Sequence, residues 1–550
     1  MAAGWLARGT THRAAPTLTD PELAAGKAAG CPIRKGEAAF DECVHSAPSG
    51  RPLQRTLYWK SASPQIGRRA VGDECMMGQA VLSRPMCRRS LLSLGGLWPF
   101  GLTLPRLLAA QPRVRRRAAQ RCLLVFMEGG PSHIDLWDVK PQAPLEVRGE
   151  FRPIQSSHPE LPLSELLPGL SRHAHRFAVI RSVTHGIVDH NAGSYYALCG
   201  RFPVEGGQLV LTDRTDTFPP LGAVAAKLRP TAGPLPAYVQ IAEKQFNNGY
   251  DIPGQAGGFL GPAYDPFVTG DPSIPDFTPP GFSPLPELSA DRIAQRSRLL
   301  ADLERSLARL SDDPRWDRLG VFQRQALQLI SSPEVRSAFD LSREPAALRE
   351  KYGMDRGSNR AIEARQFGGL PHLGQSTLLA RRLLERGVRL VTLVTGRRID
   401  QAWDTHRQHF RLMRQSLCPP FDQAMTALLD DLAERGLLDD TLVVFFGEFG
   451  RTPKIGYVTS GAGATSDGRD HWPYCYSVVM AGAGIQPGAL YGASDRDGAY
   501  PIRDAVRPED IVATVYAALG IAPHTEIFDR EGRPHVVSTG RPIEAVLASS

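Results

Sequence analysis

Paired cysteines are missing from this chain of 550 residues. Its 8 cysteines are scattered, and no two of them have the C-x-x-C spacing that is typical of cysteine-bound zinc. The sequence therefore indicates neither a zinc cluster held by cysteines nor a dense disulfide framework.

A long apolar run is also missing. The most apolar stretch, from Leu91 to Leu108, is interrupted by glycine and proline and is shorter than the roughly 20 residues that a membrane span needs. No other segment qualifies, so the sequence predicts no stable transmembrane span.

Nucleic-acid signatures are absent too, although the net charge is +7 and the pI is about 9.0. Part of the basic excess is local, because several arginines lie near one segment: Arg106, Arg113, Arg115, Arg116, Arg117 and Arg121. There is no basic helix interleaved with aromatic residues and no zinc-finger spacing, so we expect no nucleic-acid partner.

The first 85 residues lack sustained hydrophobic periodicity. They mix proline, glycine, arginine and single apolar residues. This composition predicts a disordered extension at 1–85, unless the translation start lies downstream at Met76, Met77 or Met86.

The segment 86–110 has the layout of a twin-arginine export signal. Arg88 and Arg89 precede the apolar stretch, which ends in small residues. Its glycines and prolines would break a buried helix, which is the competing interpretation. With a start near Met86 we expect a periplasmic or secreted protein, whereas a signal placed after a long extension would not direct export.

From about residue 118 the chain alternates between short apolar runs and amphipathic helices. The order of helix and strand from 376 to 446 predicts parallel pairing, with helices on the faces of a sheet. We therefore expect an α/β domain at 118–545, which contains a Gly/Pro-rich and helical insertion at 245–375. The expected strands are Cys122–Met127, Phe177–Ile180, Tyr238–Ala242, 388–396, Leu442–Phe446 and Ser477–Ala481.

Ionisable residues gather after the strand Leu442–Phe446. Glu448 follows directly, and Arg451, Arg469 and His471 lie in the loop beyond. In open α/β sheets, ligands bind outside the carboxyl ends of the strands. Carboxylate, imidazole and guanidinium groups at that edge indicate a metal ion or an anionic substrate.

Asp404, His406 and His471 form a workable ligand set for one zinc-like or manganese-like ion, with a fourth position open. Asp404 and His406 are two residues apart, so both side chains can face one point. The competing interpretation is a turn in which Asp404 and Thr405 cap a helix. The cofactor that we expect is a divalent metal, namely zinc, manganese or calcium.

Two further roles stay open from the residues alone. Glu448 is either another metal ligand or a general base, or it forms a structural salt bridge with Arg451. Arg451 and Arg469 either clamp the oxygens of an anionic substrate or lie on the surface as ordinary arginines.

Several motifs occur in an order that resembles the domain-of-unknown-function family 1501. They are FMEGGPSHIDLWDVKP, RSVTHGIVDHNAGSYYALCG, GQAGGFLGPAYDPF, LLARRLLERGVRLVTL, WDTH, LLDDTLVVFFGEFGRTPK, GRDHWP and PEDIVATVYAALG. This family is similar to the alkaline phosphatase and sulfatase superfamily. The resemblance implies an alkaline-phosphatase-like, parallel-rich sheet flanked by helices, and metal-assisted hydrolysis of phosphate or sulfate esters.

The superfamily pattern implies site residues as well. Its first-strand acid, a metal ligand, corresponds here to Glu128 or Asp135. Its nucleophile slot holds His190, with Ser194 one helical turn later and no paired base visible in the sequence. The histidine that usually ends a later strand is replaced by the phenylalanine after Glu448, which departs from a two-metal site.

Together these features predict an exported, metal-dependent hydrolase of sulfate or phosphate esters. The expected substrate is an anionic ester, either a small molecule or a polysaccharide. The alternatives are a non-catalytic binding protein with the same fold, which the departures at His190 and after Glu448 favour, and a surface scaffold that works with partner proteins.

Overall fold

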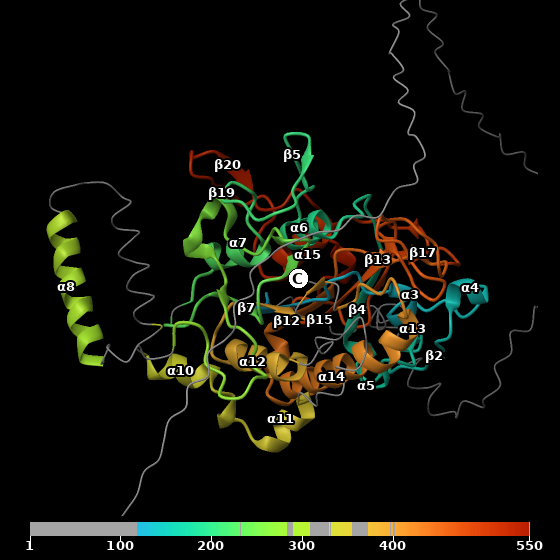
Figure 1. Ribbon diagram of the computed structural model, residues 1–550, viewed down its shortest axis with the longest axis horizontal. Helices are drawn as coiled ribbons and strands as arrows, with labels where there is room; N and C mark the ends of the chain where they lie inside the picture. The colour runs from blue at the N-terminus through green and yellow to red at the C-terminus, as the bar shows by residue number, and fades with distance from the viewer. Residues whose placement is uncertain are drawn as a thin grey trace, which may run out of the picture. The chain divides into compact units, whose positions relative to one another are not determined.

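A computed structural model gives the fold (Figure 1). The structure describes residues 118–231, 233–282, 290–308, 329, 332–354, 372–396, 398–399 and 402–548. The extension expected at 1–85 and the export signal expected at 86–110 lie outside the described residues.

The described residues form one large sheet, whose strand order is β10-β7-β11-β1-β12-β15-β4-β16. The sheet is mostly parallel, because only β15 runs against both of its neighbours. The strands are β1 (Arg121–Phe126), β4 (Phe177–Val183), β7 (Tyr238–Ile241), β10 (Phe267–Val268), β11 (Leu390–Val394), β12 (Thr441–Phe446), β15 (Tyr476–Gly482) and β16 (Leu490–Tyr491).

Helices cover both faces of this sheet. In Figure 1, α12 (Leu373–Glu385) and α14 (Cys418–Glu434) lie on one side of it, and α6 (His190–Cys199), α7 (Leu221–Leu228) and α15 (Pro508–Ala518) lie on the other. The expected α/β class, a parallel-rich sheet flanked by helices, is confirmed.

The two cores follow from the apolar character of the strands. Side chains of a strand alternate between faces, so a strand that is apolar throughout contributes to both. Leu123 and Val125 of β1 join the core with α12 and α14, whereas Leu124 and Phe126 join the core with α6, α7 and α15.

The remaining elements are short, apart from α8. They are α3 (His133–Leu136), α4 (Leu145–Arg148), β2 (Pro153–Ile154), β3 (Leu163–Ser164), α5 (Pro168–Ser171), β5 (Val204–Glu205), β6 (Gln208–Leu209), β8 (Phe246–Asn247), β9 (Tyr250–Asp251), α8 (Ala290–Ala308), α10 (Pro333–Phe339), α11 (Ala346–Tyr352), α13 (His409–Leu412), β13 (Gly450–Arg451), β14 (His471–Trp472), β17 (Ala493–Ser494), β18 (Pro501–Arg503), β19 (Glu526–Phe528) and β20 (Pro534–Val536). Within the described ranges, no helix has both the length and the apolar character required to cross a membrane.

Four strands direct the chain to one edge of the sheet. β1, β4, β11 and β12 run in the same direction, so the segments that follow them meet at their carboxyl ends. Gly129, in the turn after β1, has φ +97°, and a Cβ atom there would lie 2.5 Å from the backbone nitrogen of Asp404. A glycine at this position lets the segment after β11 lie against the end of β1.

Candidate functional site

Four side chains converge at this edge, and we call them the metal group: His190, Asp404, His406 and His471. One ligand atom from each lies within 4.8 Å of all the others. His190 begins α6, Asp404 and His406 follow β11, and His471 belongs to β14. Three of the four were predicted from the sequence as metal ligands, and His190 was predicted as a catalytic residue.

His406 and His471 turn the same ring nitrogen towards the group. The Nδ1 atom of His471 donates to the carbonyl oxygen of Val188 at 2.7 Å, and the Nδ1 atom of His406 donates to that of Gly463. Since carbonyl oxygens only accept, both Nδ1 atoms carry the proton, and in neutral rings both Nε2 atoms present lone pairs. These two Nε2 atoms lie 2.9 Å apart. A cation beside them would satisfy both lone pairs.

His190 is oriented by a carboxylate. Its Nδ1 atom lies 2.6 Å from Oε1 of Glu448, and that oxygen also accepts from the backbone nitrogen of Gly129 at 2.8 Å. The Nε2 atom of His190 is buried and faces Oδ1 of Asp404 at 3.2 Å. An imidazole held by a carboxylate through one nitrogen, with the other nitrogen directed at a shared point, is the usual arrangement of a metal-binding histidine.

Asp404 supplies the central oxygen. Its Oδ1 atom lies 3.2 Å from Nε2 of His190, 2.8 Å from Nε2 of His406 and 3.3 Å from Nε2 of His471. The same oxygen also contacts the guanidinium of Arg451. Burial alone would raise the pKa of Asp404, but Arg451 and His190 outweigh it and hold the pKa well below its ordinary value. Asp404 is therefore a carboxylate, which is the form that binds metal.

The imidazoles differ in basicity without an ion. Burial alone would lower the pKa of His190, but Asp404 and Glu448 outweigh it and raise the pKa to about 9. Burial and the neighbouring His190 lower the pKa of His471 to about 3. In the metal-free protein a proton on His190 therefore balances part of the negative charge, and an ion that binds there replaces this proton.

Glu448 lies beside the metal group and not in it. It was predicted as a ligand or a base, and the structure places its carboxylate behind His190, where it is fully buried. Phe449, the next residue, packs its ring 4.9 Å from that of His190 and 4.7 Å from that of His471. The phenyl ring at the position after Glu448 therefore packs against two of the imidazoles of the group.

Arg451 and Arg469 are both fully buried and make internal contacts. Arg451 donates to the carbonyl oxygens of Gly129, Gly130 and Arg469 and contacts Asp404. Arg469 donates to carbonyl oxygens at 147, 452 and 453 and pairs with Asp135. These guanidinium groups hold loops together, and the structure does not bring Arg469 to the metal group.

Asp135, also predicted as a metal ligand, lies in a separate buried cluster. Its Oδ2 atom is 2.8 Å from Nε of Arg469 and 2.9 Å from Nε2 of His409. Burial would raise the pKa of Asp135, but Arg469 and His409 outweigh it and lower the pKa below its ordinary value. This cluster joins α3 to the start of α13 and to the loop that precedes β14.

Acid should weaken the fold through Asp135. A carboxyl whose pKa is depressed on folding contributes stability above its unfolded pKa of about 4, and this contribution is lost as the pH falls through the folded value. We expect the free energy of unfolding to fall between about pH 4 and pH 2, and to fall less steeply in Asp135→Asn. Denaturant titrations at each pH test this. Asp302→Asn, at a carboxylate that is 62% exposed, is the control, and equal slopes in all three proteins would contradict the prediction.

Glu128, the other acid of the first strand, also lies outside the metal group. Burial raises its pKa to about 8, although its carboxyl accepts hydrogen bonds from the backbone nitrogens of Thr395 and Gly396, which lower the pKa. The side chain therefore links the ends of β1 and β11. Within the described residues, neither Glu128 nor Asp135 belongs to the metal group.

Ser194 lies one helical turn after His190 on α6. Its hydroxyl is buried and has no hydrogen-bond partner among the described residues, so no base is placed to activate it. Asp189 caps the helix by accepting from the backbone nitrogen of Ala192 at 3.0 Å. The positive end of the helix dipole therefore lies at the metal group.

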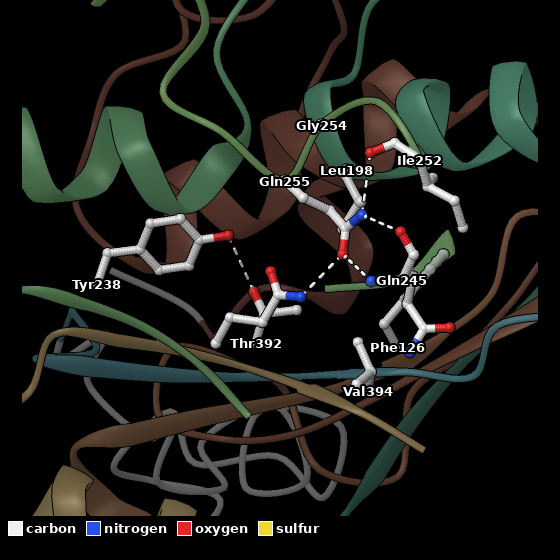
Figure 2. Close-up of a pocket in the computed structure, with 10 residues that line it drawn as sticks. Phe126, Leu198, Tyr238, Gln245, Ile252, Gly254, Gln255, Thr392 and Val394 are labelled. Atoms are coloured by element: carbon white, nitrogen blue, oxygen red, sulfur yellow. Dashed lines mark hydrogen bonds between the residues drawn. The ribbon is translucent and has the colours of Figure 1, made fainter. Parts of the chain in front are cut away.

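A small cavity with three glutamines in its lining lies beside β7 and β11 (Figure 2). Its glutamines bond to one another: Oε1 of Gln255 accepts from Nε2 of Gln240 at 2.8 Å and from the backbone nitrogen of Gln245 at 2.7 Å. The free volume of about 10 Å³ leaves room for about one water molecule. Because the space is so small, we assign this cavity no ligand.

Three solved structures show what the chain is similar to. The TAB5 alkaline phosphatase mutant His 135 Glu, solved with magnesium bound, is 9% identical and has a TM-score of 0.31, with 74% of this chain and 99% of that chain covered. The sulfatase PsFucS1 from Pseudoalteromonas sp. is 13% identical, with a TM-score of 0.31 and coverage of 80% and 72%. The lipoteichoic acid synthase LtaP from Listeria monocytogenes is 12% identical, with a TM-score of 0.30 and coverage of 78% and 76%.

These TM-scores are low, so the assignment of the fold rests on the sheet and its helices. The comparison with curated proteins gave no match. A family model described as a protein of unknown function (DUF1501) matches residues 119–547, which include every member of the metal group. The resemblance seen in the sequence is confirmed, and the chain belongs to the DUF1501 family.

Proposed function

We propose that this protein is a metal-dependent hydrolase of sulfate or phosphate esters, exported by the twin-arginine route when its start lies near Met86. A single divalent ion would be held by His190, Asp404, His406 and His471. The observation that carries this proposal is the convergence of three imidazole nitrogens and one carboxylate within 4.8 Å. Three imidazoles favour zinc first and manganese second over calcium, which prefers oxygen ligands.

The ion would act as a Lewis acid on an oxygen of the sulfuryl or phosphoryl group. The chain's own residues prepare the site. Glu448 fixes the ring of His190, and Phe449 packs against the rings of His190 and His471. The N-terminus of α6 offers partial positive charge to the anionic oxygens of an ester. Arg451 offsets the charge of Asp404 and holds it in place.

A second candidate function is metal binding without catalysis. Two observations favour it: the hydroxyl of Ser194 lacks a base, and the guanidinium groups of Arg451 and Arg469 point into the protein. A hydrolase with this site would need water as its nucleophile, because no activated side chain is present among the described residues of the site.

Metal analysis and turnover together separate the two functions. We expect about one zinc or manganese ion per purified chain, and at an ion concentration 100-fold above the dissociation constant an increase of about 2.7 kcal/mol in the free energy of unfolding. Aryl sulfates and aryl phosphates are the substrates to test, before and after chelation. Metal-dependent turnover supports the hydrolase, and bound metal without turnover supports the second candidate. Absence of bound metal contradicts both.

Glu448 should influence metal affinity although it does not touch the ion. Glu448→Gln keeps the shape of the side chain but replaces the charged acceptor behind His190, so we expect the dissociation constant of the metal to rise by roughly 10-fold to 100-fold. Calorimetric titration with zinc measures this. Glu509→Gln is the control, because Glu509 accepts from Tyr196 and lies outside the metal group. An unchanged constant in Glu448→Gln would argue against the assigned role.

A further inference from the structure

Four aromatic rings form a connected cluster around the residue that follows His471, and we call it the aromatic platform: Tyr457, Trp472, Tyr474 and Tyr500. Trp472 lies at its centre, with ring centroids 6.3 Å from Tyr457, 4.8 Å from Tyr474 and 5.6 Å from Tyr500. The rings of Tyr474 and Tyr500 are 6.0 Å apart and inclined by only 39°, so they face in similar directions.

The platform combines a fixed base with an accessible surface. Trp472 is only 7% exposed, and its Nε1 atom donates to the carbonyl oxygen of Ala499 at 2.7 Å. Tyr457, Tyr474 and Tyr500 are 51%, 37% and 52% exposed. Tyrosine faces usually lie against other apolar groups, so three exposed rings around one fixed indole indicate a binding surface.

The backbone connects the platform to the metal group. Trp472 follows His471 directly in β14, and the hydroxyl of Thr459 ties the loop of Tyr457 to the carbonyl oxygen of His471 at 2.6 Å. Successive side chains of a strand leave on opposite faces, so the platform and the imidazole of His471 lie on the two faces of the ribbon formed by β13 and β14. A small ester bound at the metal group would therefore not extend to the platform, whereas a chain of several sugar rings would be long enough to contact both.

We propose that the aromatic platform binds sugar rings of an oligosaccharide or polysaccharide whose esterified unit lies at the metal group. This inference rests on the proposed function, because it assigns that hydrolase a carbohydrate ester as its substrate. A sugar ring offers a flat face of C–H bonds and an edge of hydroxyl groups. Tyrosine matches both, with a ring face for stacking and a hydroxyl group at its edge.

The size of the platform favours a sugar over a protein partner. A tyrosine side chain contributes about 150–250 Å² when it is fully covered. Three rings of which about half is exposed therefore present roughly 300 Å², well below the ~800 Å² per partner of a stable protein interface. An area of this size suits one or two stacked sugar rings.

Glycan binding by a double variant tests the proposal. The proteins are wild type, the double variant Tyr474→Ala with Tyr500→Ala, and the control Tyr250→Ala, which removes a tyrosine that is 59% exposed on β9. The probes are arrays of sulfated and desulfated oligosaccharides of four to eight units, followed by calorimetric titration of the glycans that wild type retains. All proteins are treated with chelator, so that binding is measured without turnover, and thermal unfolding establishes that each variant is folded.

We expect wild type to bind desulfated as well as sulfated glycans, and the dissociation constant of the desulfated ones to rise by ~10-fold or more in the double variant. The control should match wild type. The proposal is overturned if wild type retains no glycan, or if the three proteins bind the glycans equally. If glycans bind but metal analysis and turnover assays of the untreated protein are negative, the platform is supported and the proposed hydrolase is wrong. If aryl esters are turned over but no glycan binds, the hydrolase is supported and the platform is wrong.

Discussion

Replacing His406 with alanine should abolish stoichiometric metal binding at micromolar protein concentration. His406 is the most accessible imidazole of the metal group, and its Nε2 atom lies 2.8 Å from Oδ1 of Asp404 and 2.9 Å from Nε2 of His471. Loss of a direct ligand should cost more than the loss of a residue that only orients one. We therefore expect the dissociation constant to rise by more than ~100-fold. Metal analysis after gel filtration and calorimetric titration with zinc measure the loss.

The matched control is His524→Ala. This histidine is exposed, so it tests whether any imidazole on the chain contributes to the measured metal. The free energy of unfolding of the metal-free His406→Ala variant should stay close to that of wild type, because no neighbouring charge loses its only partner. Retention of one ion per chain by His406→Ala would show that the ion does not bind at the metal group.

Replacing Asp135 with alanine should destabilise the protein by about 3–5 kcal/mol, since it leaves the guanidinium of Arg469 buried without its carboxylate. Arg469 is fully buried, and its remaining partners are carbonyl oxygens, which do not neutralise its charge. The expected result is a lower midpoint in urea and a lower unfolding temperature. Denaturant unfolding followed by circular dichroism provides the measurement.

An exposed ion pair supplies the contrast. Asp216 contacts Arg214 at 2.9 Å, but its side chain is 70% exposed, so Asp216→Ala should change stability little. A loss in Asp135→Ala no larger than that in Asp216→Ala would mean that water or a rearranged loop compensates Arg469. The assigned role of the buried cluster would then be wrong.

The order of the sheet could be predicted in part from local patterns. The run CLLVF is apolar at every position, which requires burial on both faces, and β1 indeed lies between β11 and β12. Helix boundaries followed from similar local chemistry, as with Pro508 in the first turn of α15. The sequence does not indicate that β15 runs in the opposite direction, because a parallel and an antiparallel strand of the same apolar residues look alike in sequence.

The candidate site could be predicted in part, because Asp404, His406 and His471 were named as one ligand set from their residue types and from the loops in which they lie. Asp404 and His406 are two residues apart, and that spacing alone suggested a shared ligand. His190 was assigned to a nucleophile slot by resemblance, whereas its Nε2 atom lies 3.2 Å from Oδ1 of Asp404. The position of His190 in the sequence could have indicated this role. His190 begins a helix that follows a strand, so it lies at the same edge of the sheet as Asp404.

The sequence by itself determined the fold class and the family, because burial of apolar residues and the order of motifs are written along the chain. It also named the residue types that a metal ion would need. Tertiary structure alone decided which of those residues meet: His190 and Asp404 are brought together by the pairing of strands far apart in the chain, while Asp135 is held away from them by Arg469. The physical reason is that a ligand set depends on distances between atoms of a few ångströms, and these are set by the packing of the whole sheet.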